Sequence, residues 1–428
     1  MKNIFIIILI SLAFAINAQD EKITYIHCGT ILDVEELKEL EEYTIVIEGN
    51  KIKSVEKGYA EVPDEVEYID LKEYTVMPGL MDAHVHLESE SNPKKYLERF
   101  TLEDADVAFR AAEYAERTLM AGFTFVRDLG GSGVNISLRN AINSGWVDGP
   151  RIMTAGKSIA TTGGHADPTN GMKRRFSGDA TPMNGVADGP YQAREAVRYR
   201  YKNGADVIKI TATGGVLSVA KDGQGPQFKP DELEAIISTA KEYGMTTAAH
   251  AHGAEGMKRA VEAGITSIEH GTLMTEEVMD LMIEKGTYLV PTISAGKFVA
   301  EKAKIDGYFP ELVVPKALEI GPKIQDTFGK AYKKGVKIAF GTDAGVSPHG
   351  ENAKEFIFMV EGGMPAFEAI RAATLTTAEL FEVEDQVGII KEGMLADIVA
   401  VKGDPLENIE IMTDVAFVMK DGKLYKSE

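Results

Sequence analysis

The first of the segments that predict the fold is Val76-Met77-Pro78-Gly79-Leu80-Met81-Asp82-Ala83-His84-Val85-His86. It is an apolar run of strand length that ends in two histidines placed two positions apart. The same pattern returns along the chain, where a short apolar segment ends in a polar residue and a longer helical segment follows. The candidate strands end at His86, Asp128, Ala155, Thr213, His250, His270, Thr292 and Asp343.

Helical segments lie between these candidate strands, for example at 104–120, 190–203, 230–243 and 254–263. Several of them are followed by a glycine, as helix C-termini often are. Alternation of strands and helices on this scale indicates parallel strands joined by right-handed crossovers. Eight such units favour a closed barrel over an open sheet. The sequence therefore predicts an α/β fold with a TIM-like (β/α)8 barrel over residues 78–384.

The two ends of the chain have a different pattern, with short strands and tight turns. Residues 19–77 contain a hairpin signal around Gly49-Asn50, and residues 385–428 contain another around Asp421-Gly422. We expect the two ends to meet as one small β-sandwich domain beside the barrel.

The N-terminal residues have the pattern of an export signal. Lys2 precedes an apolar run from Ile4 to Ala15, and small residues up to Ala18 suit cleavage there, so residues 1–18 are predicted to be a signal peptide. The alternative is an uncleaved membrane anchor, for which the run is short. The expected mature protein is secreted or periplasmic and is not bound to a membrane. The single cysteine, Cys28, excludes an internal disulfide.

Composition narrows the class of partner. The 428 residues are 44% hydrophobic and 26% charged, which is ordinary for a globular protein. The formal net charge of −20 argues against nucleic acid or an anionic membrane surface as a partner, and it favours solubility. The expected partner is a small-molecule or dipeptide substrate.

We expect the active site at the carboxyl ends of the barrel strands, where the active sites of such barrels lie. Residues two apart on a strand point to the same side, so His84 and His86 can hold one cation together. A His-x-His pattern alone is weak evidence, since two histidines can also be structural. The recurrence of polar residues at successive strand ends is the main evidence for an active site there.

Lys209 interrupts the apolar segment Val207-Ile208-Lys209-Ile210. A charged, unpaired lysine inside a strand is costly. One explanation is a buried ion pair with an acidic neighbour. The other is a lysine that has reacted with carbon dioxide, because the resulting carbamate is an anion that can bridge two metal ions.

Three further strand ends carry possible ligands. His250 and His252 follow one candidate strand, His270 ends the next, and Asp343 ends the last, where it can bind metal and accept a proton from water. The same-side rule does not choose between His250 and His252. Six of the eight histidines follow predicted barrel strands: His84, His86, His165, His250, His252 and His270.

The segments Pro78–His86, Gly341–Gly345 and Glu392–Asp397 together resemble the amidohydrolase superfamily over nearly all of the mature chain. The segments 161–167, 209–215 and 250–253 are most similar to its imidazolonepropionase-like or Xaa-Pro dipeptidase (prolidase) branch. This branch includes secreted dipeptidases and an amidase that acts on ochratoxin.

The resemblance implies a role for each candidate residue. His84, His86 and Asp343 would bind one divalent metal, and His250 and His270 would bind a second. Lys209, as N6-carboxylysine, would bridge the two, and zinc suits the histidines although other metals remain open. His165 and His252 would line the substrate pocket, and Asp343 would be the general base. The branch also implies a homo-oligomer.

The predicted reaction is hydrolysis of the amide bond of a dipeptide or N-acyl amino acid by a hydroxide that bridges two metal ions. His165 would assist at the carbonyl, and Asp343 would pass the proton to the leaving amine. A lactonase or phosphotriesterase would use the same site. A hydrolytic deaminase is a further alternative, because His252 and Glu255 have the His-x-x-Glu spacing, although Lys209 argues against it.

Overall fold

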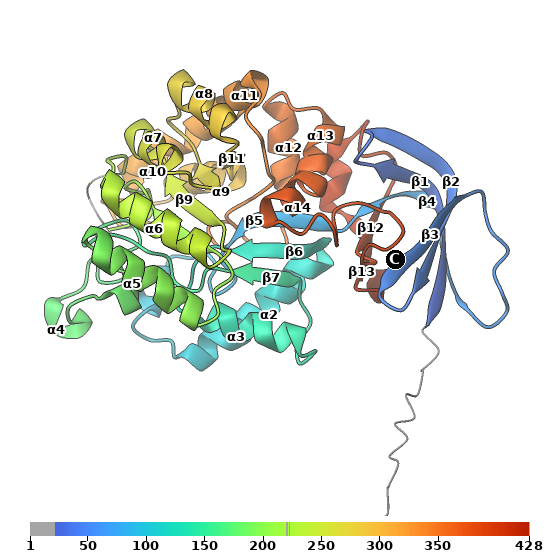
Figure 1. Ribbon diagram of the computed structural model, residues 1–428, viewed down its shortest axis with the longest axis horizontal. Helices are drawn as coiled ribbons and strands as arrows, with labels where there is room; N and C mark the ends of the chain where they lie inside the picture. The colour runs from blue at the N-terminus through green and yellow to red at the C-terminus, as the bar shows by residue number, and fades with distance from the viewer. Residues whose placement is uncertain (1–21, 220, 222, 428) are drawn as a thin grey trace, which may run out of the picture.

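The computed structural model describes residues 22–219, 221 and 223–427. The predicted signal peptide, residues 1–18, lies outside these residues, so it stays a prediction. Within the described part of the chain, no helix is long and apolar enough to cross a membrane. Figure 1 shows a helix-rich body with a sheet at one end, to which both the blue N-terminal and the red C-terminal segments contribute.

Strands from both ends of the chain form this terminal sheet. Its order is β14-β13-β12-β4-β1-β2-β3. β4 pairs with β1 in parallel and with β12 in antiparallel orientation, so the two ends of the chain meet between β4 and β12. The strands are β1 (Ile23–Asp33), β2 (Lys38–Glu48), β3 (Lys51–Lys57), β4 (Glu67–Pro78), β12 (Ile398–Lys402), β13 (Val415–Lys420) and β14 (Lys423–Ser427).

The expected sandwich of two sheets is, within the described residues, one continuous seven-stranded sheet. The sheet curls toward its own core, since Lys51 on β3 forms an antiparallel bridge with Leu395, and the Ile52 amide donates to the Met394 carbonyl. Apolar side chains from both ends of the chain fill that core, among them Ile45 and Phe417. A curled sheet buries one apolar face without a second sheet.

Parallel strands run through the helix-rich body, as predicted. They form a three-stranded sheet, β5-β6-β7, and a four-stranded sheet, β11-β10-β9-β8. Each strand ends within two residues of its predicted end. These strands are β5 (Leu80–Val85), β6 (Phe123–Asp128), β7 (Arg151–Thr154), β8 (Ile208–Thr211), β9 (Thr247–Ala251), β10 (Ser267–His270) and β11 (Tyr288–Val290).

The eighth predicted strand, ending at Asp343, is not a regular strand. One cause is that the Thr342 amide donates to the Asp82 carboxylate, so it is not available to a neighbouring strand. The segment still reaches β11 on one side and β5 on the other through single bridges, and another bridge links the residues after β7 to β8. These bridges are Leu289↔Ile338, Val85↔Ala344 and Ile159↔Ile210. The regular eight-stranded barrel predicted from the sequence is therefore not observed as such, and the described residues form two parallel sheets connected by isolated bridges.

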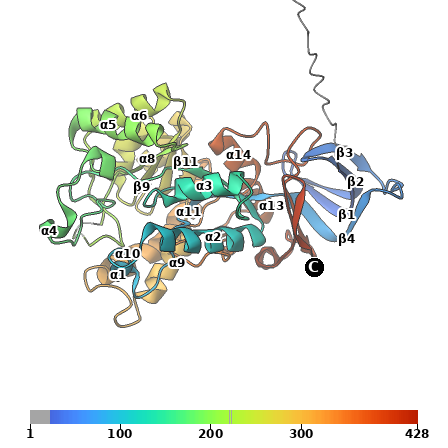
Figure 2. The ribbon, with the colours of Figure 1, turned by 90° about the horizontal axis from the view of Figure 1, so that it is seen from below.

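Helices cover the outside of these strands (Figure 2). The four helices predicted by residue range are confirmed to within one residue at each end. The longer helices are α2 (Asp104–Met120), α3 (Val134–Asn143), α5 (Gly189–Lys202), α6 (Pro230–Glu242), α7 (Ala254–Glu262), α8 (Glu276–Lys285), α11 (Ile324–Lys334) and α12 (Lys354–Glu361). The shorter ones are α1 (Lys95–Glu98), α4 (Arg174–Ser177), η1 (Pro182–Asn184), α13 (Ala366–Ala372), α14 (Leu375–Phe381) and η3 (Ile409–Thr413).

An additional helical segment precedes α11. After β11 the chain forms α9 (Ile293–Lys302), α10 (Val314–Ile320) and the 3₁₀ turn η2 (Gly321–Lys323) before α11 begins. A strand–helix unit needs only one helix to return to the next strand. Residues 293–323, called the helical excursion below, therefore follow the carboxyl end of β11, where active-site loops lie.

Candidate active site

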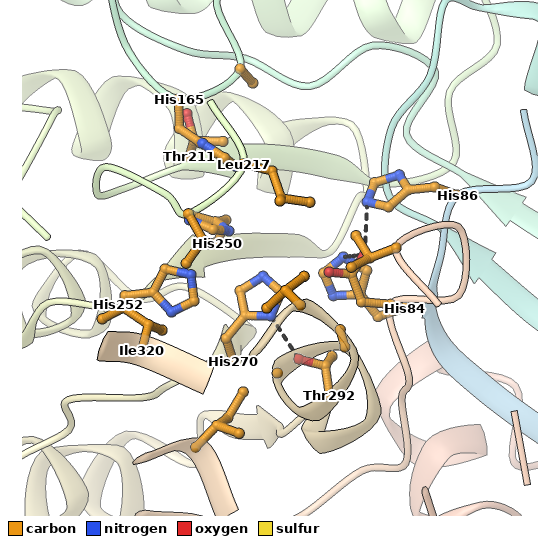
Figure 3. A pocket seen from close by; sticks show the side chains of 18 of the residues that line it. His84, His86, His165, Thr211, Leu217, His250, His252, His270, Thr292 and Ile320 are labelled. Atoms are coloured by element: carbon orange, nitrogen blue, oxygen red, sulfur yellow. Dashed lines mark hydrogen bonds and ion pairs between the residues drawn. The ribbon is translucent and has the colours of Figure 1, made fainter. Parts of the chain in front are cut away.

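Every residue predicted for the site lines one cavity of about 180 Å³. The cavity lies at the carboxyl ends of the parallel strands, and Figure 3 shows its histidines arranged around a common space. The predicted residues that line it are His84, His86, His165, Lys209, His250, His252, His270 and Asp343. The remaining histidines, His27 and His349, are not among its lining residues.

Backbone strain is concentrated at this cavity. Among the described residues, seven that are not glycine have a positive φ, and His270, Thr292 and Asp343 are three of them, with φ of 72°, 52° and 57°. This conformation is costly for residues with a Cβ atom, most of all for a β-branched one such as Thr292. Strain of this kind clusters at functional sites, where the surrounding structure holds it in place.

Three side chains form a compact group of possible metal ligands. Each of His84, His270 and Asp343 offers one atom, and these atoms lie within 4.8 Å of one another. The Nε2 atoms of His84 and His86 lie 3.7 and 3.4 Å from Asp343 Oδ1. That buried oxygen accepts no hydrogen bond from any described residue. An unsatisfied carboxylate oxygen facing imidazole nitrogens fits a divalent transition metal.

Hydrogen bonds orient these imidazoles. His84 Nδ1 donates to Glu269 Oε2 at 2.9 Å, and His86 Nδ1 donates to the Gly130 carbonyl at 2.7 Å. His270 Nδ1 lies 2.7 Å from Thr292 Oγ1 (Figure 3). The first two bonds leave Nε2 with a free lone pair, which is the arrangement that metal-binding histidines use.

Burial keeps the histidines neutral. It lowers the pKa of His86 to about 3 and holds the pKa values of His84 and His270 well below their ordinary value, with further lowering by the Lys209 charge. Neutral imidazole is the form that binds metal. Burial likewise raises the pKa of Asp343 to about 7.

Lys209 lies on β8 and lines the cavity. Its Nζ atom is 3.3 Å from His84 Nε2. Within the described residues it forms no ion pair with a carboxylate, so the buried ion pair considered from the sequence is not observed there. Burial lowers the pKa of the Lys209 ammonium to about 8, which makes the neutral amine more accessible near neutral pH.

His250 lies in the cavity but outside the compact group. Its Nε2 atom is 3.3 Å from the Gly214 carbonyl, and its ring stacks on His165 with centroids 4.2 Å apart. The rings of His250 and His270 are 4.7 Å apart. The assignment of a second metal to His250 and His270 therefore stays a prediction.

The His-x-x-Glu spacing, which resembles that of deaminases, does not place Glu255 in the cavity. Glu255 lies in the first turn of α7 and accepts a hydrogen bond from Arg259 Nε at 2.7 Å. Its side chain is 57% exposed, and it is not among the lining residues. His252 lines the cavity instead, with Nδ1 2.9 Å from Thr272 Oγ1.

Sequence reasoning missed a buried ion pair behind His84. Arg127 on β6 and Glu269 on β10 are both fully buried, and Arg127 Nη2 donates to Glu269 Oε1 at 3.0 Å. Arg127 Nε also donates to the Ala83 carbonyl at 2.8 Å. The signal was present, because each is a charged residue in an apolar strand, which is the pattern that singled out Lys209.

Asp82 is a second residue whose role was missed, although it belongs to the histidine motif. Its carboxylate accepts hydrogen bonds from the backbone amides of His84 and Thr342, from the Thr342 hydroxyl and from Asn352 Nδ2. It therefore joins β5 to the segment that carries Asp343 and fixes the spacing between the two halves of the compact group.

Residues 75–425 match the model of the amidohydrolase family. The chain belongs to this family. An ochratoxinase of Aspergillus niger is 33% identical over 96% of this chain and 88% of its own length. A solved structure described as a Xaa-Pro dipeptidase with methionine bound in the active site is 57% identical, with a TM-score of 0.93 over 95% of this chain and 100% of that one. A prolidase complexed with N-methylphosphonate-L-proline is 33% identical, with a TM-score of 0.86 over the same shares.

These relatives establish the class of protein. This amidohydrolase is a hydrolytic enzyme of the prolidase-like branch, and the family typically uses divalent metal ions, which the ligand group at His84, His270 and Asp343 could accommodate.

We expect Glu269→Gln to weaken metal binding by about 10- to 100-fold, because an amide holds the His84 tautomer less strongly than a carboxylate does. The measurement is metal content after dialysis against graded chelator, together with kcat/KM. Glu277→Gln is the matched control, since Glu277 is exposed and pairs with Lys258 on the surface. Metal affinity equal to that of the control would show that Glu269 does not position His84.

Proposed function

We propose that this enzyme hydrolyses the amide bond of dipeptides or N-acyl amino acids and releases a free C-terminal amino acid. The observation that carries the proposal is the buried Asp343 carboxylate facing neutral histidines in the cavity. The relatives support the same class of bond, since one is described as a Xaa-Pro dipeptidase, another as a prolidase and a third as an ochratoxinase.

Two divalent metal ions, most simply zinc, are part of this proposal. His84, His86 and Asp343 would hold one, and His250 and His270 would hold the other after His250 turns from Gly214. When bound, the metal ions would supply Lewis-acid polarisation of the substrate carbonyl and lower the pKa of water.

Lys209 would bridge the two ions as N6-carboxylysine. In the modification, the neutral amine attacks the carbon of carbon dioxide, a C–N bond forms, and one amine proton is released. The lowered pKa of Lys209 supports this step because only the neutral amine is a nucleophile.

The chain's own residues would move the proton and hold the substrate. Asp343 would take a proton from the attacking water and then give it to the leaving amine, a task that suits a carboxyl group whose pKa is raised to about 7. His165 and His252 border the same cavity and would contact the carbonyl and the substrate carboxylate. Water adds its hydroxyl to the carbonyl carbon, and the C–N bond breaks as the amine leaves protonated.

We further infer that the two parallel sheets and the segment ending at Asp343 make one interrupted (β/α)8 ring. Export after removal of residues 1–18 and assembly into a homo-oligomer complete the proposal. N-terminal sequencing of the protein purified from its native host checks the first, and its mass in solution checks the second.

The test combines metal analysis with hydrolysis of a dipeptide library that includes Xaa-Pro, Xaa-Arg/Lys and Xaa-aromatic sets and N-acyl amino acids. About two metal ions per chain with release of a C-terminal amino acid supports the proposal. Two metal ions without amide cleavage would move the function to lactones or phosphotriesters. One metal ion would contradict the bridging Lys209 carbamate.

A further inference from the structure

The active-site cavity is lined by two chemically different groups of side chains. One group holds the metal-ligand candidates, and the other is aliphatic and is called the apolar wall below. Figure 3 shows Leu217 on the side of His165 and His86, and Ile320 beside His252. The main side chains of this apolar wall are Leu217, Ala295, Val299, Ile320, Ile324 and Val346.

The apolar wall comes mainly from the helical excursion after β11. Ala295 and Val299 lie on α9, Ile320 ends α10, and Ile324 begins α11. Val299 and Ile320 also belong to a buried apolar cluster that the excursion forms together with Val216 and Val346. One face of this small core borders the cavity.

Close helix packing holds the apolar wall in place. A Cβ atom added to Gly296 on α9 would lie 2.6 Å from Ile324 Cγ2. One added to Gly321 would clash with the Gly296 carbonyl oxygen. The two segments cross at a distance that only glycine permits, so the apolar wall cannot move aside without losing this packing.

The lining residues of the cavity with a lysine or carboxylate side chain belong to the metal-ligand candidates. Among the described residues that line it, Lys209 and Asp343 are the only ones with ionised side chains of the Lys, Arg, Asp or Glu type. Lys316 on α10 is not among the lining residues and donates to the Gly215 and Ser218 carbonyls, while burial and then its positive charge lower the pKa of His252 to about 3. A charged substrate group pressed against the apolar wall would meet no oppositely charged group among the lining residues there, and burial of such a charge is strongly unfavourable.

We infer that the apolar wall selects substrates in which one residue flanking the scissile amide has an uncharged, apolar side chain. This inference rests on the proposed amide hydrolysis and adds the substrate class. With the scissile carbonyl at the His84–Asp343 end, the adjacent side chain fills the space before Val299 and Ile320. The helical excursion is then the specificity element of this enzyme.

The test uses the metal-loaded enzyme and two dipeptide series, Xaa-Ala and Ala-Xaa, with norleucine, lysine or glutamate as Xaa. Norleucine has the same carbon chain as lysine without the ammonium group. We expect kcat/KM for norleucine to exceed the values for lysine and glutamate by at least about 100-fold in one series. Equal values in both series would overturn the inference while leaving amide hydrolysis intact. Hydrolysis of no dipeptide or N-acyl amino acid would overturn the proposed function itself.

Two variants of Ile320 test whether the apolar wall causes the selectivity between norleucine and lysine. Ile320→Asp should raise the lysine-to-norleucine ratio of kcat/KM by at least about 10-fold, because it supplies a counter-charge. Ile320→Asn is the matched control and should change the ratio little. An unchanged ratio in a folded Ile320→Asp protein would overturn the assignment, and if that variant does not fold, the wild-type series decides.

Discussion

Asp343→Asn is expected to lower kcat by at least about 1,000-fold, because the amide can neither accept the proton of water nor return it to the leaving amine. The fold should persist. Asp343 Oδ1 accepts no hydrogen bond from the described residues, and burial of an uncharged amide costs less than burial of a carboxylate. The measurement is kcat with a cleaved dipeptide, together with the thermal unfolding midpoint.

Metal content separates the two roles of Asp343. A variant that keeps its metal but loses turnover has lost the base, whereas a variant without metal has lost a ligand. Asp64→Asn is the matched control, since Asp64 is an exposed residue between β3 and β4 and does not line the cavity. Near-normal activity of Asp343→Asn would rule out the base assignment.

Arg127→Met is expected to lower the free energy of unfolding by about 3–5 kcal/mol, because it leaves the buried Glu269 carboxylate without its counter-charge. Both side chains are fully buried, so solvent cannot screen the loss. His84 Nδ1 and Ser267 Oγ still donate to Glu269, but neither carries the missing positive charge. Chemical denaturation of the purified protein measures the change.

The double variant Arg127→Met/Glu269→Gln tests the cause. It removes both charges and should recover most of the lost stability, which a double-mutant cycle reports as a coupling energy. Arg174→Met is the control, because Arg174 pairs with Asp179 at a site where both side chains are about 80% exposed, and such pairs contribute at most about 1 kcal/mol. If Arg127→Met were no more destabilising than this control, the buried pair would not stabilise the fold.

Sequence patterns located the strand ends and the residues placed there. The two-residue spacing of His84 and His86 predicted that both point the same way, and both Nε2 atoms do lie near Asp343 Oδ1. Lys209 was identified because a charge in an apolar strand needs an explanation. These predictions depend on periodicity and burial over a few neighbouring residues, which the linear sequence contains directly.

Other features depend on which distant segments meet. The Arg127–Glu269 pair joins residues 142 positions apart, and neither residue reveals its partner. The segment before Asp343 is irregular in part because the Thr342 amide donates to Asp82, 260 positions away. The separate helices α9 and α10, whose apolar faces border the cavity, were likewise not recognised in the chain.

Local spacing and composition were enough to predict the alternation of strands and helices, the positions of the candidate ligands and the family. Which buried charges pair, how His250 is oriented and which apolar side chains line the cavity became known only from the three-dimensional structure. Those properties arise from close packing between segments far apart in the chain, where the favoured contact is set by the shape and charge of both partners at once.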